Sequence, residues 1–381
     1  MTQESAGMKT NGGSGGQPIR PGAIIIKSLI LFILVNLLFS ATGIGTLGRL
    51  SLYNHVFPGR LRLPFGENPA EAYNFSLDNL DAMFSSHILA GSKKPADEFR
   101  IIVIGDSSTW GILLHPSETL TGIIDGEGLV CSGKRIRVYN LGYPTLSLTK
   151  DLVILDRAME YQPDLVIWPV TLESFPEDKQ LTSPLVQNNL DSLIKLSTKY
   201  DLDLSVKATP IPFLQRTLVG QRKQLADLIR LQLLGPMWAA TGIDQVYPVD
   251  YTKAQFDLKN DLMFHSWKPP EMPVDQLAFY ALQDGLKLAG NVPVLIVNEP
   301  ILISHGINSN IRYNFYYPIW AYDQYRQLIQ NYTQENDMHY LDLWNIIPAT
   351  EFTNSAIHLT PHGDNEFAAR VSSWVEGNLC R

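Results

Sequence analysis

Ser107 and His358 are the residues of this 381-residue sequence whose types and positions suit nucleophilic chemistry. Ser107 follows the short β-branched run 101–104 and lies in the tripeptide Gly105-Asp106-Ser107. A serine nucleophile needs a base to take its proton, and His358, in a turn before the last helical pattern, is the best candidate. The alternative is that Asp106 and Ser107 only cap a helix that begins there.

Strand and helix patterns alternate from residue 99 onward, and both candidate residues fall at the ends of elements. Buried strands are predicted at 101–104, 135–140, 164–170, 293–297 and 339–343. Helical patterns separate them, with Ser117 and Ser147 as two expected N-caps. This alternation predicts an α/β fold with a doubly wound parallel sheet and helices on both faces. The carboxyl edge of such a sheet can bring Ser107 and His358 together.

Three short blocks, in order, resemble those of the SGNH/GDSL hydrolase superfamily. The stretch GDSSTWG at 105–111 is similar to the GDSxTxG block, NLG at 140–142 to the second block, and HLTPHG at 358–363 to the terminal block. Their order and approximate spacing agree across residues 99–378. The resemblance implies a flavodoxin-like SGNH hydrolase fold and a reaction that needs no cofactor and no metal.

The resemblance also implies roles for individual residues. Ser107 would be the nucleophile and His358 the base, and the backbone N–H groups of Ser107 and Gly142 would line the oxyanion hole. Gly142 suits this because a backbone without Cβ can approach a reacting carbonyl closely. Asp106 and Asn140, which belong to the same blocks, are expected supporting residues.

The sequence departs from the family where an Asn usually donates to the oxyanion. The strand that ends at Val170 continues into Thr171-Leu172-Glu173-Ser174 and offers no Asn. We expect the Thr171 hydroxyl to donate in its place, with Ser174 as the alternative. Glu173 is a possible supporting residue, although an ionised Glu173 would oppose an oxyanion.

A second departure concerns the acid that usually stands three residues before the histidine. Ser355 occupies that position, and Asn354 precedes it. We expect the Asn354 side-chain oxygen to orient the imidazole, as an amide does in Cys-His-Asn sites, with Ser355 as a supporting residue. The alternative carboxylates are Glu351 and Asp342.

The N-terminal part predicts a membrane anchor. Residues 1–20 are rich in glycine and serine and predict a disordered tail. Residues 21–42 are apolar over about the length of a bilayer crossing and predict a transmembrane anchor. A cleaved signal peptide and a buried core helix remain alternatives. Residues 43–95 form a juxtamembrane segment and linker, and residues 96–381 an SGNH-like domain.

Residues 176–290 interrupt the alternation and predict a mostly helical insertion. It would cover the site, grip the membrane surface or add packing layers to the domain. The two cysteines, Cys131 and Cys380, are either free thiols or one long-range disulfide. The net charge of −8 excludes a nucleic-acid partner of the usual basic kind.

These features favour a membrane-anchored serine esterase or O-acyltransferase acting on acyl esters, including those of cell-surface glycans. The resemblance implies a single-pass protein of the cell membrane, an extracytoplasmic catalytic domain and a membrane-bound acyltransferase as partner. One rival is a catalytically impaired module that binds glycan or a protein partner. Another is a soluble secreted lipase whose apolar segment is cleaved.

Overall fold

A computed structural model describes residues 20–380, except for 67–76, 203–211 and 242–249. Residues 1–19 and 381 lie outside the described part, and so does nearly all of the predicted disordered tail. The side chains of residues 44 and 45 are also left out.

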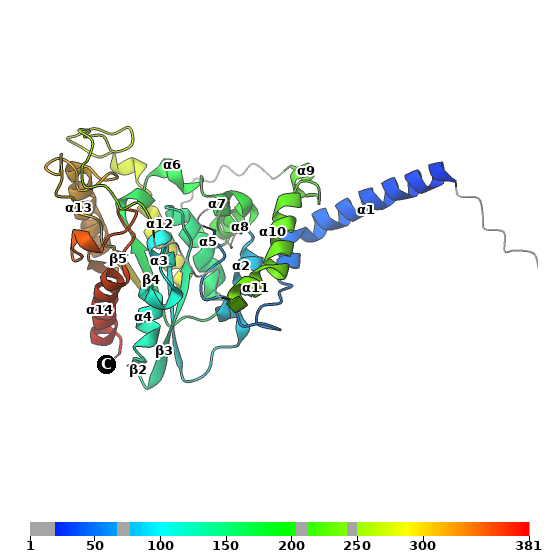
Figure 1. The fold of residues 1–381 in the computed structure, drawn as a ribbon, viewed down its shortest axis with the longest axis horizontal. Helices are drawn as coiled ribbons and strands as arrows, with labels where there is room; N and C mark the ends of the chain where they lie inside the picture. Colours follow the sequence, from blue (N-terminus) through cyan, green and yellow to red (C-terminus); the bar gives the residue numbers. More distant parts are fainter. Residues whose placement is uncertain (1–19, 67–76, 203–211, 242–249, 381) are drawn as a thin grey trace, which may run out of the picture.

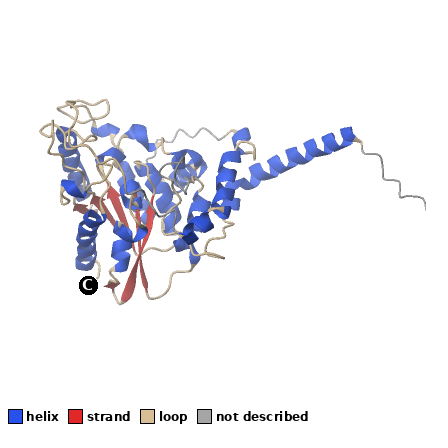
Figure 2. Cartoon of the chain, in the orientation of Figure 1, coloured by secondary structure: helices blue, strands red, loops and turns tan. Residues whose placement is uncertain are grey.

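Six strands form one sheet in the centre of the domain (Figure 2). The strands are β1 (Glu98–Gly105), β2 (Val130–Cys131), β3 (Lys134–Gly142), β4 (Leu165–Val170), β5 (Val294–Asn298) and β6 (His339–Asp342). Their order is β2-β3-β1-β4-β5-β6, and all neighbours are parallel except β2 and β3. The five parallel strands therefore follow the flavodoxin-like order, whose switch point lies between β1 and β4.

Helices surround this sheet and extend from it (Figure 1). They are α1 (Pro21–Gly48), α2 (Leu80–Ser86), α3 (Ser107–Trp110), α4 (Leu120–Gly126), α5 (Leu148–Met159), α6 (Glu177–Gln180), α7 (Pro184–Asn188), α8 (Leu190–Tyr200), α9 (Phe213–Arg216), α10 (Arg222–Leu233), α11 (Gly235–Thr241), α12 (Tyr280–Ala289), α13 (Ile319–Glu335) and α14 (Pro361–Asn378).

The sheet has a hydrophobic core on each face, as a doubly wound fold requires. Ile101 and Val103 of β1 pack with α4 and α14, whereas Ile102 and Ile104 pack with α5, α12 and α13. Successive side chains of a strand point to opposite faces of the sheet. A strand that is buried on both faces is therefore a continuous run of apolar residues in the sequence. The predicted fold class is therefore confirmed.

Local details differ from the sequence-based prediction at three places. Thr119, not Ser117, caps α4, because Ser117 belongs to a tight turn that His115 caps. The antiparallel edge strand β2, with two residues, was too short to predict. The insertion is helical in α6–α12, but residues 250–279 form loops and turns with no α-helix.

Pro21–Gly43 is, among the described residues, the one helical stretch long and apolar enough to cross a membrane. It extends away from the domain in Figure 1 and exposes its apolar side chains along most of its length. Gly43 has φ +71° and breaks the helix, and the remaining turn of α1 packs against α2. There, the Ser85 hydroxyl donates to the Gly48 carbonyl oxygen (2.7 Å).

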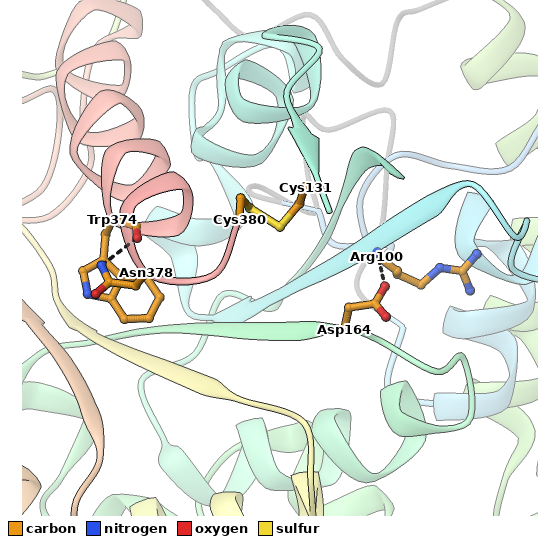
Figure 3. The surroundings of a disulfide bond; sticks show 6 residues. All are labelled: Arg100, Cys131, Asp164, Trp374, Asn378 and Cys380. Carbon is orange, nitrogen blue, oxygen red and sulfur yellow. Dashed lines mark hydrogen bonds between the residues drawn. A yellow bond between two sulfur atoms is a disulfide. The ribbon is translucent and has the colours of Figure 1, made fainter. Parts of the chain in front are cut away.

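The two cysteines form a disulfide between Cys131 on the edge strand β2 and Cys380 after α14 (Figure 3). The bond joins positions 249 residues apart. Next to it, the Asp164 carboxylate accepts a hydrogen bond from the Arg100 N–H (2.6 Å), and thereby ties the start of β4 to β1. The disulfide therefore links the last helix to β2, the edge strand at the opposite side of the sheet from β6.

Candidate active site

The structure brings Ser107, His358 and Asn354 together. Ser107 begins α3 directly after β1, and His358 lies in the segment between β6 and α14. His358 Nε2 is 2.8 Å from Ser107 Oγ, and its Nδ1 is 2.7 Å from Asn354 Oδ1. Because the amide oxygen accepts from Nδ1–H, Nε2 presents its lone pair to the serine hydroxyl. This is the tautomer that a general base requires.

The environment of His358 keeps its imidazole neutral. Desolvation by burial lowers its pKa to about 4. A base is effective only in its unprotonated form, so the imidazole can take a proton from Ser107 at any pH well above 4.

A sharp turn between β1 and α3 presents Ser107. Gly105 has φ +151°, and a Cβ at this position would lie 2.4 Å from Thr109 Oγ1, so glycine is required here. Asp106 is buried, and its Oδ1 caps α3 by accepting from the Ser108 N–H (2.8 Å). The cap interpretation therefore holds for Asp106. The Ser107 N–H is the first of this helix and has no acceptor within it, so it remains the candidate oxyanion donor.

Gly142 and Asn140 hold α3 against β3. The Gly142 N–H donates to Asn140 Oδ1 (3.0 Å). A Cβ at Gly142 would lie 2.5 Å from the Trp110 nitrogen, so glycine permits the close approach of α3. The role of the Gly142 N–H as an oxyanion donor stays a prediction. Asn140 Nδ2 donates to the Thr109 carbonyl oxygen (2.7 Å).

Thr171 and Glu173 also have protein partners, and the oxyanion role of Thr171 stays a prediction. The fully buried Thr171 hydroxyl lies 2.9 Å from the Tyr317 hydroxyl. Glu173 forms ion pairs with Lys179 and His265. Burial opposes ionisation of Glu173, but His265 and Lys179 lower its pKa. These contacts fasten the segment after β4 to the insertion.

The other residues considered as partners of His358 contact different groups. Ser355 is buried, and its side chain forms a hydrogen bond with the Tyr316 hydroxyl. Glu351 accepts from the Thr360 hydroxyl, and Asp342 pairs with Arg326 (2.9 Å). Asn354 is thus the orienting residue among those predicted.

A buried charged cluster beneath α3 was not predicted. Lys150 of α5 is fully buried, and its Nζ donates to the Gly105 (2.6 Å) and Tyr143 (3.1 Å) carbonyl oxygens and lies 2.5 Å from Asp151 Oδ1. Burial raises the pKa of Asp151 to about 6. Lys150 therefore fixes the carbonyl group of Gly105, which lies two residues before Ser107.

Glu299 completes this cluster from the end of β5. It accepts a hydrogen bond from the Ser108 hydroxyl. Burial raises the pKa of Asp106, and burial together with the Asp106 charge raises that of Glu299 well above its ordinary value. Two buried carboxyl groups that interact in this way share one proton. The pair therefore fixes Ser108, the residue after the nucleophile.

Two sequence signals could have found this cluster. Glu299 directly follows a buried strand, as Ser107 does, and the same sheet edge receives both. Lys150 and Asp151 lie at the start of an apolar helical pattern, where adjacent opposite charges indicate a buried pair. Neither signal shows that the two groups lie beneath Ser107.

A cleft of about 510 Å³ lies beside Asn354, which is the member of the predicted site in its lining. Residues 252–261, except Phe256 and Asn260, form one wall, and Arg312 and Phe315 the other. Its lining mixes lysines, aspartates and backbone, with Phe315 as the exposed aromatic ring. No group of three or more His, Cys, Asp or Glu side chains in the described ranges is placed to hold a metal.

The strand order, the switch-point position of Ser107 and its contact with His358 decide the fold. The chain has a flavodoxin-like doubly wound fold with a Ser–His pair at its switch point. No protein-family model matches the sequence, and no curated protein matches it.

Solved structures similar to this chain include a member of the lipolytic G-D-S-L family from Veillonella parvula (10% identity, 72% of this chain and 96% of that chain, TM-score 0.34). A carbohydrate acetylesterase family member from Sinorhizobium meliloti is 12% identical over 74% and 98% of the two chains, with TM-score 0.33. An aryl esterase from M. smegmatis is 14% identical over 73% and 98%, with TM-score 0.32.

Proposed function

We propose that this protein is a membrane-anchored serine esterase or O-acyltransferase that works through an acyl-enzyme on Ser107. The contact that carries the proposal is the 2.8 Å approach of His358 Nε2 to Ser107 Oγ, with Asn354 on the other ring nitrogen. A neutral imidazole held in this tautomer is what a serine nucleophile requires.

The reaction proceeds in two proton-balanced halves. Ser107 Oγ attacks the ester carbonyl carbon while His358 Nε2 takes the hydroxyl proton, and the Ser107 N–H stabilises the oxyanion. The carbonyl re-forms as the alcohol leaves with the proton from His358, and an acyl-serine remains. Water or a sugar hydroxyl then attacks that ester and gives its proton to His358. His358 returns this proton to Ser107 Oγ as the acyl group leaves, which regenerates the serine hydroxyl and the neutral imidazole.

The cleft beside Asn354 supports a polar substrate such as an acylated glycan. Its walls carry Lys253, Asp257 and Lys259, which suit a hydroxyl-rich molecule better than a long acyl chain. The exposed Phe315 ring supplies an apolar surface for the flat face of a sugar. The acyl group would lie toward Ser107 and the carrier in the cleft.

Two observations support the cellular placement. Asn36 and Phe39 of α1 are buried against the domain, so the last turns of the apolar helix are part of the fold, which favours an uncleaved anchor. The disulfide between Cys131 and Cys380 suits an oxidising compartment, which favours an extracytoplasmic domain.

Fluorophosphonate labelling of the full chain in detergent tests the proposal. We expect labelling of the wild type and loss of about 10³-fold or more in Ser107→Ala and His358→Ala. His362→Ala is the matched control, because His362 is exposed and pairs only with Glu366 (3.3 Å), and it should label as the wild type does. A folded wild type that does not label would instead favour the glycan-binding module.

The rate at which the acyl-enzyme loses its acyl group distinguishes an esterase from an O-acyltransferase. After rapid acylation with an activated acetyl ester, a transferase should lose its acetyl group faster when sugar acceptors are added. Equal rates with water alone and with sugars would assign the protein as an esterase.

A further inference from the structure

The segment of residues 212–223, comprising α9 and its connection to α10, exposes apolar side chains beside α1. Leu214 is 75% exposed and Phe213 50%, and Val219 is also exposed. Figure 1 shows α9 and α10 next to the point where α1 leaves the domain. Within the described part of the chain these large apolar groups are left exposed, and an apolar medium such as the lipid of a membrane would cover them.

A hydrogen bond sets the position of this segment along α1. The Val219 N–H donates to Asn36 Oδ1 (3.4 Å), and Asn36 Nδ2 donates back to the Phe32 carbonyl oxygen (2.9 Å). Asn36 is buried there. The loop therefore lies beside a residue well inside the apolar stretch Pro21–Gly43.

The length of the span then determines the depth of the segment. The part of α1 before Asn36 contains about 15 residues and rises about 22 Å, at 1.5 Å per residue. A bilayer core is about 30 Å thick, so this part alone is too short to cross it. The crossing needs the turns beyond Asn36 as well, and these turns carry the α9–α10 segment with them into the membrane surface.

The charges of the segment match an anionic surface. No acidic residue occurs between Pro212 and Ala226, whereas Arg216, Arg222 and Lys223 are all exposed. Apolar groups that enter the acyl boundary, flanked by cations at the headgroups, are typical of interfacial anchors.

We propose that the α9–α10 segment is a second membrane contact, which inserts Phe213, Leu214 and Val219 into an anionic lipid surface beside α1. This inference rests on the membrane anchoring by α1 that is part of the proposed function. It fixes the orientation of the domain, because a helix and a separate loop together define a plane, whereas one helix alone leaves the domain free to tilt.

Depth-dependent fluorescence quenching of the full chain in lipid nanodiscs tests this contact. A fluorophore is attached to Leu214→Cys, to Leu31→Cys within α1, or to Ala369→Cys on the exposed face of α14. The two native cysteines are already paired, so each variant has a single reactive thiol. Lipids with a spin label near the headgroup or deeper in the chain serve as quenchers.

We expect the headgroup-proximal quencher to lower the emission of the Leu214 probe about 2-fold or more, since interfacial anchors lie 5–10 Å deep. The Leu31 probe should respond to the deeper quencher and the Ala369 probe to neither. Replacing Arg216, Arg222 and Lys223 together by Gln should reduce quenching at Leu214 in anionic discs to the level seen in neutral ones.

The outcomes separate this inference from the proposed function. If the Leu31 probe is quenched and the Leu214 probe is not, the membrane contact is overturned and the anchor stands. If neither is quenched, anchoring itself fails. A Leu214 probe with blue-shifted emission but no quenching by lipid would assign the patch to a protein partner or a second copy. The quenching measurements are repeated in Ser107→Ala. Equal quenching in this variant would show that the membrane contact does not depend on enzymatic activity.

Discussion

His358 has two hydrogen bonds that differ in what they add to catalysis. The contact with Ser107 moves the proton, and the contact with Asn354 sets the ring orientation and tautomer. A neutral amide oxygen stabilises the imidazolium less than a carboxylate does. Desolvation by burial lowers the pKa of the imidazole to about 4, which makes it a weak base.

Asn354→Asp should strengthen the base. A carboxylate beside Nδ1 favours the charged imidazolium and raises the pKa of His358, so the rise of kcat/KM with pH should move from near 4 to higher pH. Above that pKa we expect kcat/KM to increase about 10-fold, because the imidazolium formed during the reaction is stabilised. The measurement is a pH profile with a soluble aryl ester.

Two variants give this prediction its controls. Asn354→Ala should lower kcat/KM, because the ring loses its orienting acceptor. Asn365→Asp introduces the same charge on the exposed surface of α14 and should leave the profile unchanged. If kcat/KM of Asn354→Asp still rises near pH 4, residue 354 does not influence the pKa of the His358 imidazole.

At the scale of elements, the nucleophile is positioned by a helix of only four residues. Such a turn has too few hydrogen bonds of its own to be stable. Asn140 of β3 donates to the Thr109 carbonyl oxygen, Glu299 directly after β5 binds the Ser108 hydroxyl, and Lys150 of α5 donates to the Gly105 carbonyl oxygen. Three separate elements therefore determine where Ser107 points.

Lys150→Met should destabilise the protein strongly and in a pH-dependent way. It leaves the buried Asp151 carboxylate without its cation, which costs about 3–5 kcal/mol. Protonation of Asp151 removes the unpaired charge. The loss of stability should therefore be smaller at pH 5 than at pH 8, because at pH 8 the folded state must hold Asp151 ionised although its pKa is raised. Urea unfolding in detergent at both pH values measures this.

Lys287→Met is the matched control. Lys287 pairs with the buried Asp284 at 3.1 Å, also in a helix, but its own side chain is 46% exposed. We expect a smaller loss than for Lys150→Met, because water can take the place of the half-exposed Lys287 ammonium group but not that of the fully buried Lys150 group. Equal losses in the two variants would show that burial of Lys150 is not what matters.

At the scale of the whole molecule, the apolar helix α1 lies at one end and α14 at the other (Figure 1). His358 precedes α14, and the disulfide ties the far end of this helix to β2. His358 thus belongs to a unit that is held to the sheet at both ends. Ser107 follows a central strand and needs no such tie.

Replacing Cys131 and Cys380 together by Ala should lower the free energy of unfolding by about 2–4 kcal/mol, because the cross-link restricts the unfolded chain. Labelling of Ser107 under native conditions should persist, since neither cysteine contacts the site. Guanidinium unfolding of the variant, and of the wild type with and without reductant, measures the effect. An unchanged midpoint in both would mean that the bond adds nothing to stability.

The sequence by itself determined the parallel sheet and the pairing of Ser107 with His358. Both follow from local information, because a β-branched run predicts a buried strand and a polar turn after it lies at the carboxyl edge. The α5 cap at Ser147 was local in the same way and is confirmed. The family blocks then named the same two residues.

Only the tertiary structure decided what the neighbours of Ser107 do. Whether Gly142 and Thr171 can reach an oxyanion depends on Asn140 and Tyr317, which take up their hydrogen-bonding groups. The Lys150 cluster, the disulfide partners and the position of the α9–α10 segment against Asn36 are also contacts between distant parts of the chain. Periodicity and spacing describe one element at a time, whereas burial and hydrogen bonding across elements arise when the elements pack.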